Sequence, residues 1–102
     1  MKNISQAEWQ ELTANNPDAI IIDVRTEGEF VSGKLENAIN IDIFETGSFI
    51  HKIEAMDKSK EYFLYCRSGQ RSANACRLLE SSGISKVYNL SGGIMSWTGT
   101  VV

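Results

Sequence analysis

Apolar runs of strand length alternate along the chain with segments of helical pattern. Residues 19–24 are apolar except at Asp23, which is typical of a strand covered on both faces. Three further segments have strand character: 38–43, the aromatic-rich 61–66, and 86–90. Because strands that alternate with helices form parallel sheets sandwiched between those helices, the pattern predicts an α/β fold.

Helix start and stop signals separate these strands. Ser5–Glu8 and Thr26–Glu29 are capping-box patterns, and each opens a short helix. The first helix has Trp9 and Leu12 on one face, and Gly33 ends the second. We therefore expect one short helix before the strand at 19–24 and another between that strand and the strand at 38–43.

Two longer helices complete the pattern. One is predicted over 44–56, with an apolar stripe formed by Phe49, Ile50, Ile53 and Met56. Another is predicted over 72–82, with Gly83 as its C-terminal cap. A last short helix is expected between Gly92-Gly93 and Trp97.

Composition and charge narrow the class of protein. The 102 residues suit one domain over 1–102, and 42% apolar with 23% charged residues is typical of soluble globular chains. A net charge of −3 argues against broad binding to nucleic acid or to an anionic membrane. No apolar stretch approaches the ~20 residues that span a bilayer, and the first residues lack a signal-peptide pattern. We therefore expect a cytoplasmic protein without nucleic-acid or membrane partners.

The cysteine count indicates how the thiols are used. Two cysteines and one histidine are too few for a zinc cluster, so neither a metal nor a cofactor is expected. A Cys66–Cys76 disulfide is disfavoured because cytoplasmic thiols are kept reduced. A reduced, reactive thiol is the more natural expectation.

The loop after the strand at 61–66 carries the richest chemistry of the chain. It contains Cys66, Arg67, Ser68, Gly69, Gln70, Arg71 and Ser72, and a helix is expected to begin near the last of these. Ligands of open parallel sheets bind at the carboxyl ends of the strands, and a helix N-terminus favours an anion. A Cys66 thiolate is such an anion, and cysteines in this setting have a lowered pKa. Gly69 allows successive N–H groups to converge as an anion-binding nest.

A free cysteine at a strand end is more often an inert core residue, because free cysteine is among the most buried residue types. Here Arg67 and Arg71 lie within five residues of Cys66, among polar neighbours. An inert cysteine needs no arginine-rich loop after it. The loop therefore favours a reactive Cys66.

Three segments together resemble the single-domain rhodanese-like (thiosulfate sulfurtransferase) family over roughly residues 4–99. The loop Cys66–Ser72 looks like the active-site loop of that family. The family's first strand and following turn are similar to Ile21–Arg25 with Glu29-Phe30, Gly33 and Ala38–Ile41. Its C-terminal element is similar to Leu90–Ile94 with Trp97. The resemblance implies a central parallel sheet of five strands with helices on both faces.

The resemblance also implies a sulfurtransferase mechanism. Cys66 would take a sulfane sulfur from thiosulfate or another persulfide donor, hold it as a persulfide, and pass it to a thiol or to cyanide. The amides of 67–72 would surround the terminal sulfur. Arg67 and Arg71 would orient the donor and offset charge on the leaving sulfite. A protein thiol is a further candidate acceptor.

The chain departs from the family pattern at two positions. Gly33-Lys34-Leu35 stands where the family usually has Gly-His-Ile, and Asp42 stands where it usually has proline. Both lie away from the nucleophile loop. They bear on the rim of the pocket, and hence on donor or acceptor preference, more than on catalysis.

Two other polar positions have competing interpretations. Asp23 could serve as an acid or base near Cys66, or it could form a buried network with Arg25 that pins the strand end. The structural interpretation is favoured, because sulfur transfer by a thiolate needs no proton abstraction. Arg25 could still border the pocket. Cys76 follows Ala73 and precedes Leu79 at helical spacing, so a core position is favoured over a resolving thiol.

Three alternative functions compete with sulfur transfer by a free-standing enzyme. A phosphatase or arsenate reductase also uses a cysteine followed by an arginine-serine pair, but normally with five intervening residues, whereas four separate Cys66 from Arg71. A non-catalytic module would be expected to lack the cysteine. A sulfur carrier that relays its persulfide to a protein with slow turnover needs the same residues, so the sequence leaves it open.

Overall fold

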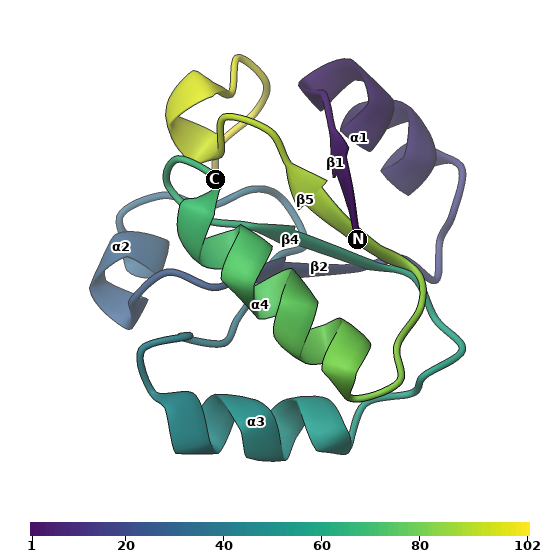
Figure 1. Ribbon diagram of the computed structural model, residues 1–102. Coiled ribbons are helices and arrows are strands. Elements are labelled where there is room, and N and C mark those ends of the chain that lie inside the picture. The colour runs from purple at the N-terminus through teal and green to yellow at the C-terminus, as the bar shows by residue number, and fades with distance from the viewer.

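Five parallel strands form the central sheet in the computed structural model, which describes residues 1–102 (Figure 1). Their bounds are β1 Lys2–Ile4, β2 Ile20–Asp23, β3 Ile39–Asn40, β4 Tyr62–Tyr65 and β5 Val87–Leu90. Their order across the sheet is β1-β5-β4-β2-β3, and every neighbouring pair is parallel. The predicted α/β class with a five-stranded parallel sheet is confirmed.

Helices cover both faces of this sheet, also as predicted. Their bounds are α1 Gln6–Ala14, α2 Glu27–Val31, α3 Thr46–Glu54 and α4 Gln70–Ser81, with a 3-10 turn η1 at Ile94–Ser96. In Figure 1, α4 crosses in front of the strands, α3 lies below it, and α1 lies apart from both near β1. None of the helices combines the length and the apolar character needed to cross a membrane.

Strand alternation divides the buried side chains into two cores. Tyr62, Leu64 and Cys66 belong to the larger core, which α3 and α4 cover, whereas Phe63 and Tyr65 belong to the smaller core around Trp9 of α1. Successive strand residues point to opposite faces, so β4 supplies both cores. The same alternation sends the Cys66 side chain to the α4 side of the sheet.

The N-terminal strand was not located by the sequence pattern. In β1 only Ile4 is buried, and three residues with one buried side chain give no alternation to detect. The capping box predicted at Ser5–Glu8 is also only half formed. Ser5 Oγ accepts the Glu8 N–H, but the Glu8 carboxylate pairs with Lys2 instead of returning to the cap. Thr26 and Glu29, by contrast, form the complete box.

Several predicted boundaries shift. The strand expected over 38–43 is limited to Ile39–Asn40, because the Asp42 carboxylate accepts the Phe44 N–H and turns the chain toward α3. The helix expected over 44–56 occupies only Thr46–Glu54. The helix expected from near Ser72 begins at Gln70, immediately after Gly69. The last shift matters for function, since it brings the start of α4 closer to Cys66.

Candidate active site

The loop between β4 and α4 is shorter than the sequence pattern indicated. Strand β4 ends at Tyr65, Cys66 follows it, and α4 begins four residues later at Gln70. Gly69 precedes the helix with φ +104°, a left-handed conformation that glycine adopts at little cost. This turn places the first amides of α4 directly above the cysteine.

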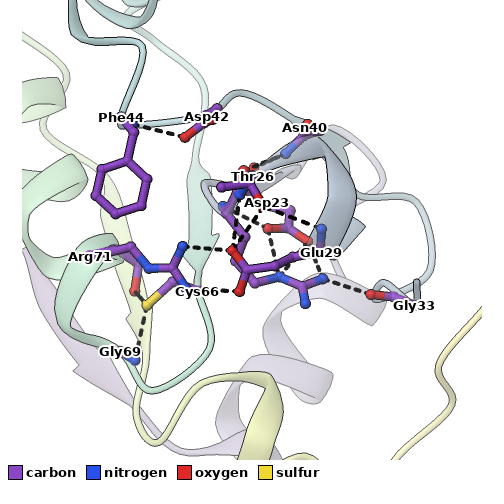
Figure 2. Close-up of polar contacts among 12 residues, drawn as sticks. Asp23, Thr26, Glu29, Gly33, Asn40, Asp42, Phe44, Cys66, Gly69 and Arg71 are labelled. Carbon is purple, nitrogen blue, oxygen red and sulfur yellow. Dashed lines mark hydrogen bonds and ion pairs between the residues drawn. The ribbon is translucent and has the colours of Figure 1, made fainter. Parts of the chain in front are cut away.

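The Cys66 sulfur accepts hydrogen bonds from this turn, although the residue is buried. The Gly69 N–H lies 3.1 Å from Sγ, and the Ser72 hydroxyl lies 3.4 Å from it (Figure 2). Burial alone would raise the pKa of the thiol, but the hydroxyl and amide of Ser72 and the amides of Gly69 and Ser68 outweigh it and lower that pKa. The positive end of α4 acts in the same direction. The site therefore favours a sulfur anion.

The C-terminal segment holds the back of the loop. The Ile94 N–H donates to the Cys66 carbonyl at 2.9 Å, and the Met95 N–H donates to the Arg67 carbonyl at 3.0 Å. Gly93 packs so closely that a Cβ there would lie 2.3 Å from the Arg67 oxygen. The glycine pair thus does more than permit the expected tight turn, because it lets η1 bind the backbone of the cysteine loop.

Arg71 is engaged by a carboxylate. Its guanidinium donates to both oxygens of Glu29 at 2.8 and 3.0 Å and lies over the Phe44 ring (Figure 2). Glu29 also accepts the Thr26 N–H in the capping box, so α2 presents one carboxylate to its own first turn and to α4. The sequence showed Glu29 as a capping residue and as part of the family-like segment after the first strand, but not as a partner of Arg71. Its pairing with Arg71 joins residues 42 positions apart, which no local pattern reveals.

The remaining loop residues face outward. Arg67, Ser68 and Gln70 are exposed, and none of their side chains forms a hydrogen bond within the protein. The structure thus brings together Cys66, Gly69 and Ser72 around the sulfur and leaves Arg67 at the rim. Since the charge of Arg67 is unpaired, it is available to an anionic donor.

Asp23 and Arg25 form a buried ion pair at the end of β2. Arg25 Nη2 lies 2.6 Å from the Asp23 carboxylate and donates to the Gly33 carbonyl at the same distance. This is the network that pins the strand end to the turn after α2. Neither side chain bonds to Cys66, so the arrangement offers no base to the sulfur.

The second cysteine lies in the core, as predicted. Cys76 is fully buried among the residues that α4 packs against the sheet, and this burial raises the pKa of its thiol to about 12. His51, the single histidine, is exposed on α3. Cys66 is therefore the one thiol whose surroundings favour the anion.

One buried polar residue at the site went unnoticed in the sequence. Asn89 of β5 contacts both Gly69 and Ser72. An asparagine inside the otherwise apolar strand Val87–Leu90 is a usable signal, since a buried amide requires partners. Those partners could not be named before the strand order was known.

Together these features define an α/β domain that presents an anion-stabilised cysteine between a strand and a helix. Residues 5–100 match the rhodanese-like domain family, and the chain belongs to that family. YtwF of Bacillus subtilis, provisionally named a sulfurtransferase, is 38% identical over 97% of this chain and 92% of its own. A sulfurtransferase of Allochromatium vinosum is 29% identical over 95% of this chain and 88% of its own.

Solved structures give the same relationship. A rhodanese-related protein of Thermoplasma volcanium superposes with a TM-score of 0.84 at 30% identity, covering 100% of this chain and 98% of its own. The human single-domain sulfurtransferase TSTD1, at 22% identity and a TM-score of 0.79, shares the fold over 98% of this chain and 99% of its own. Sulfurtransferase activity in general is supported by the relatives from Bacillus subtilis and Allochromatium vinosum.

A second group of relatives has another activity. The tRNA uridine(34) hydroxylase of Wolbachia pipientis is 35% identical over 94% of this chain, but the match covers only 35% of that protein. This chain thus corresponds to about one third of the hydroxylase.

Proposed function

We propose that the protein transfers a sulfane sulfur from thiosulfate or a persulfide donor to a thiol or cyanide through a persulfide on Cys66. The observation that supports this most is the sulfur of Cys66 at the N-terminus of α4, hydrogen-bonded by Gly69 and Ser72. A persulfide anion extends the same site by one atom. It needs donors of the kind that the loop amides supply.

The chemistry proceeds as two displacements. The Cys66 thiolate attacks the outer sulfur of thiosulfate, the S–S bond of the donor breaks, and sulfite leaves with the bonding electron pair. The acceptor thiolate or cyanide then attacks the outer sulfur of the persulfide, and the Cys66 thiolate leaves. Both steps move one sulfur with no net gain or loss of electrons by the protein, so no cofactor takes part.

The two arginines have different roles in this proposal. Arg67, which is exposed and unpaired, attracts the anionic donor to the loop. Arg71 adds positive charge beside the sulfur while Glu29 fixes its orientation. Because Glu29 neutralises much of the Arg71 charge, Arg67 contributes more to attracting the donor, and Arg71 more to shaping the pocket.

The test is the intact mass of the reduced protein after incubation with thiosulfate. We expect a gain of one sulfur atom, retained in Cys76→Ala and absent in Cys66→Ser, and a slower gain in Arg71→Ala. No gain in the folded wild type would overturn the proposal, and an adduct that persists in Cys66→Ser would place the sulfur elsewhere. An adduct that cyanide removes slowly, but a protein thiol removes rapidly, would identify the relay form of the same chemistry.

A phosphatase is not proposed. The loop has four residues between Cys66 and Arg71, and the Arg71 guanidinium is bound to Glu29, so a tetrahedral oxyanion has a smaller cradle than that chemistry needs.

A further inference from the structure

Asn89 joins the end of the cysteine loop and the first turn of α4 to the sheet. Its Nδ2 donates to the Gly69 carbonyl at 3.1 Å and to Asn3 Oδ1 of β1 at 2.9 Å. Its Oδ1 lies 2.5 Å from the Ser72 hydroxyl. Asn89 is 3% exposed, so its amide depends on these partners within the protein.

The orientation of this amide is determined by its contacts. The Gly69 carbonyl can only accept a hydrogen bond, so the atom beside it must be the Nδ2 donor. Oδ1 therefore faces Ser72, and it can only accept. The Ser72 hydroxyl is the donor in that pair.

This orientation creates a competition for one proton. The Ser72 hydroxyl lies within reach of two acceptors, Asn89 Oδ1 at 2.5 Å and Cys66 Sγ at 3.4 Å, but it has a single hydrogen. While Cys66 is a thiol, its S–H can donate to Ser72 Oγ, and the hydroxyl hydrogen stays on Asn89. When the sulfur is an anion, the hydroxyl can donate to it only by leaving Asn89 Oδ1.

We propose that Asn89 is a positioning residue that controls, through the Ser72 hydroxyl, how strongly the Cys66 sulfur is hydrogen-bonded in its thiol and anionic forms. The relevance to sulfur transfer rests on the proposed function. The hydrogen bond to Asn89 opposes donation to the thiolate. It also returns the hydroxyl to one fixed position whenever the sulfur is neutral.

Other charged groups near the sulfur do not take part in this exchange. Arg71 of α4 is held by Glu29 of α2, and Asp23 after β2 is held by Arg25. From β5 and β1 the facing groups are the uncharged Asn89 and Asn3. The charges of these two ion pairs and of the exposed Arg67 are the same in all the variants compared below.

The test is a double-mutant cycle read by the ultraviolet absorbance of the thiolate during a pH titration, in a Cys76→Ala background that leaves one cysteine. Ser72→Ala is introduced with Asn89 present and with Asn89→Leu. With Asn89 present, we expect Ser72→Ala to raise the titration midpoint of Cys66 by less than about half a pH unit. In the Asn89→Leu background the Ser72 hydroxyl is free to donate to the sulfur, so its removal should raise the midpoint by about one pH unit. Equal displacements in the two backgrounds would show that Asn89 does not act through Ser72.

A second measurement avoids any change at position 89. The side-chain amide resonances of Asn89 in the wild type should shift with the same midpoint as Cys66, and this response should disappear in Ser72→Ala. The same response in both proteins would overturn the proposal. Neither titration needs a sulfur donor, so the coupling can be found without a sulfur adduct, and an adduct can form without the coupling.

Discussion

At the scale of single residues, Glu29 shows how one carboxylate can serve two elements. It closes the capping box at Thr26 and holds the guanidinium of Arg71. The hydrogen bonds from Arg71 contribute most to lowering the pKa of Glu29 to about 2, against an ordinary value of 4.5. Ionised Glu29 therefore stabilises the folded state.

This shift predicts a pH-dependent effect of Glu29→Gln. Because the pKa is lowered on folding, the stabilisation is fully present above about pH 4.5 and is lost as the pH falls through about 2. Glutamine keeps the capping acceptor but not the charge. We expect the variant to be less stable than the wild type at pH 6 by less than about 1 kcal/mol, since the pair is partly solvated.

The measurement is the free energy of unfolding by urea between pH 6 and pH 2.5. The gap between the two proteins should stay level down to about pH 4.5 and narrow from there toward pH 2.5. A gap that stays constant over the whole range would mean that the carboxylate charge contributes nothing to the folded state.

At the scale of elements, the contact between η1 and the cysteine loop predicts an effect at a distance from Cys66 in the sequence. In Gly93→Ala the new methyl would lie 2.3 Å from the Arg67 oxygen, and the backbone there has φ +62°. We expect a loss of about 2–4 kcal/mol in the free energy of unfolding. We also expect a slower gain of sulfur from thiosulfate, since the loop must move.

Gly28→Ala is the matched control for this change. Nothing lies within 4 Å of the added methyl in α2, so it should be neutral or stabilise by up to about 1 kcal/mol. Equal stability of the two variants would mean that η1 does not hold the loop.

Local signals explain which elements the sequence could predict. The cap at Thr26, the turn at Gly69 and the apolar run of β2 each act within a few residues, so their positions were found from the pattern to within a few residues. The loop of Cys66 was found in the same way. Its chemistry depends on a strand end, a glycine and a helix start that are contiguous in sequence.

Non-local contacts explain what was missed. The partner of Arg71, the amide of Asn89 and the pairing of β1 all depend on which elements lie side by side. The expectation that Arg71 contacts the donor did not include Glu29, because a 42-residue separation leaves no periodic signal. The sequence identifies these residues, but it does not show which residues they contact in the folded protein.

At the scale of the whole molecule, β1 completes the sheet at its edge and predicts a stability effect. Ile4 is 1% exposed in the core around Trp9, so Ile4→Ala should lower the free energy of unfolding by about 2–5 kcal/mol. Ile39→Ala, in the opposite edge strand β3, removes a side chain that is 48% exposed and should cost less than about 1 kcal/mol. Urea unfolding of both variants checks this, and similar losses would show that β1 adds little to the core.

The position of β5 between β1 and β4 also sets the order in which the domain can assemble. Strand β1 pairs only with β5, and Asn3 meets Asn89 across 86 residues of chain. During synthesis β1 therefore stays unpaired until β5, near the end of the domain, has left the ribosome. Contacts this remote slow folding, so the thiol pocket becomes complete only in the final stage of the protein's maturation.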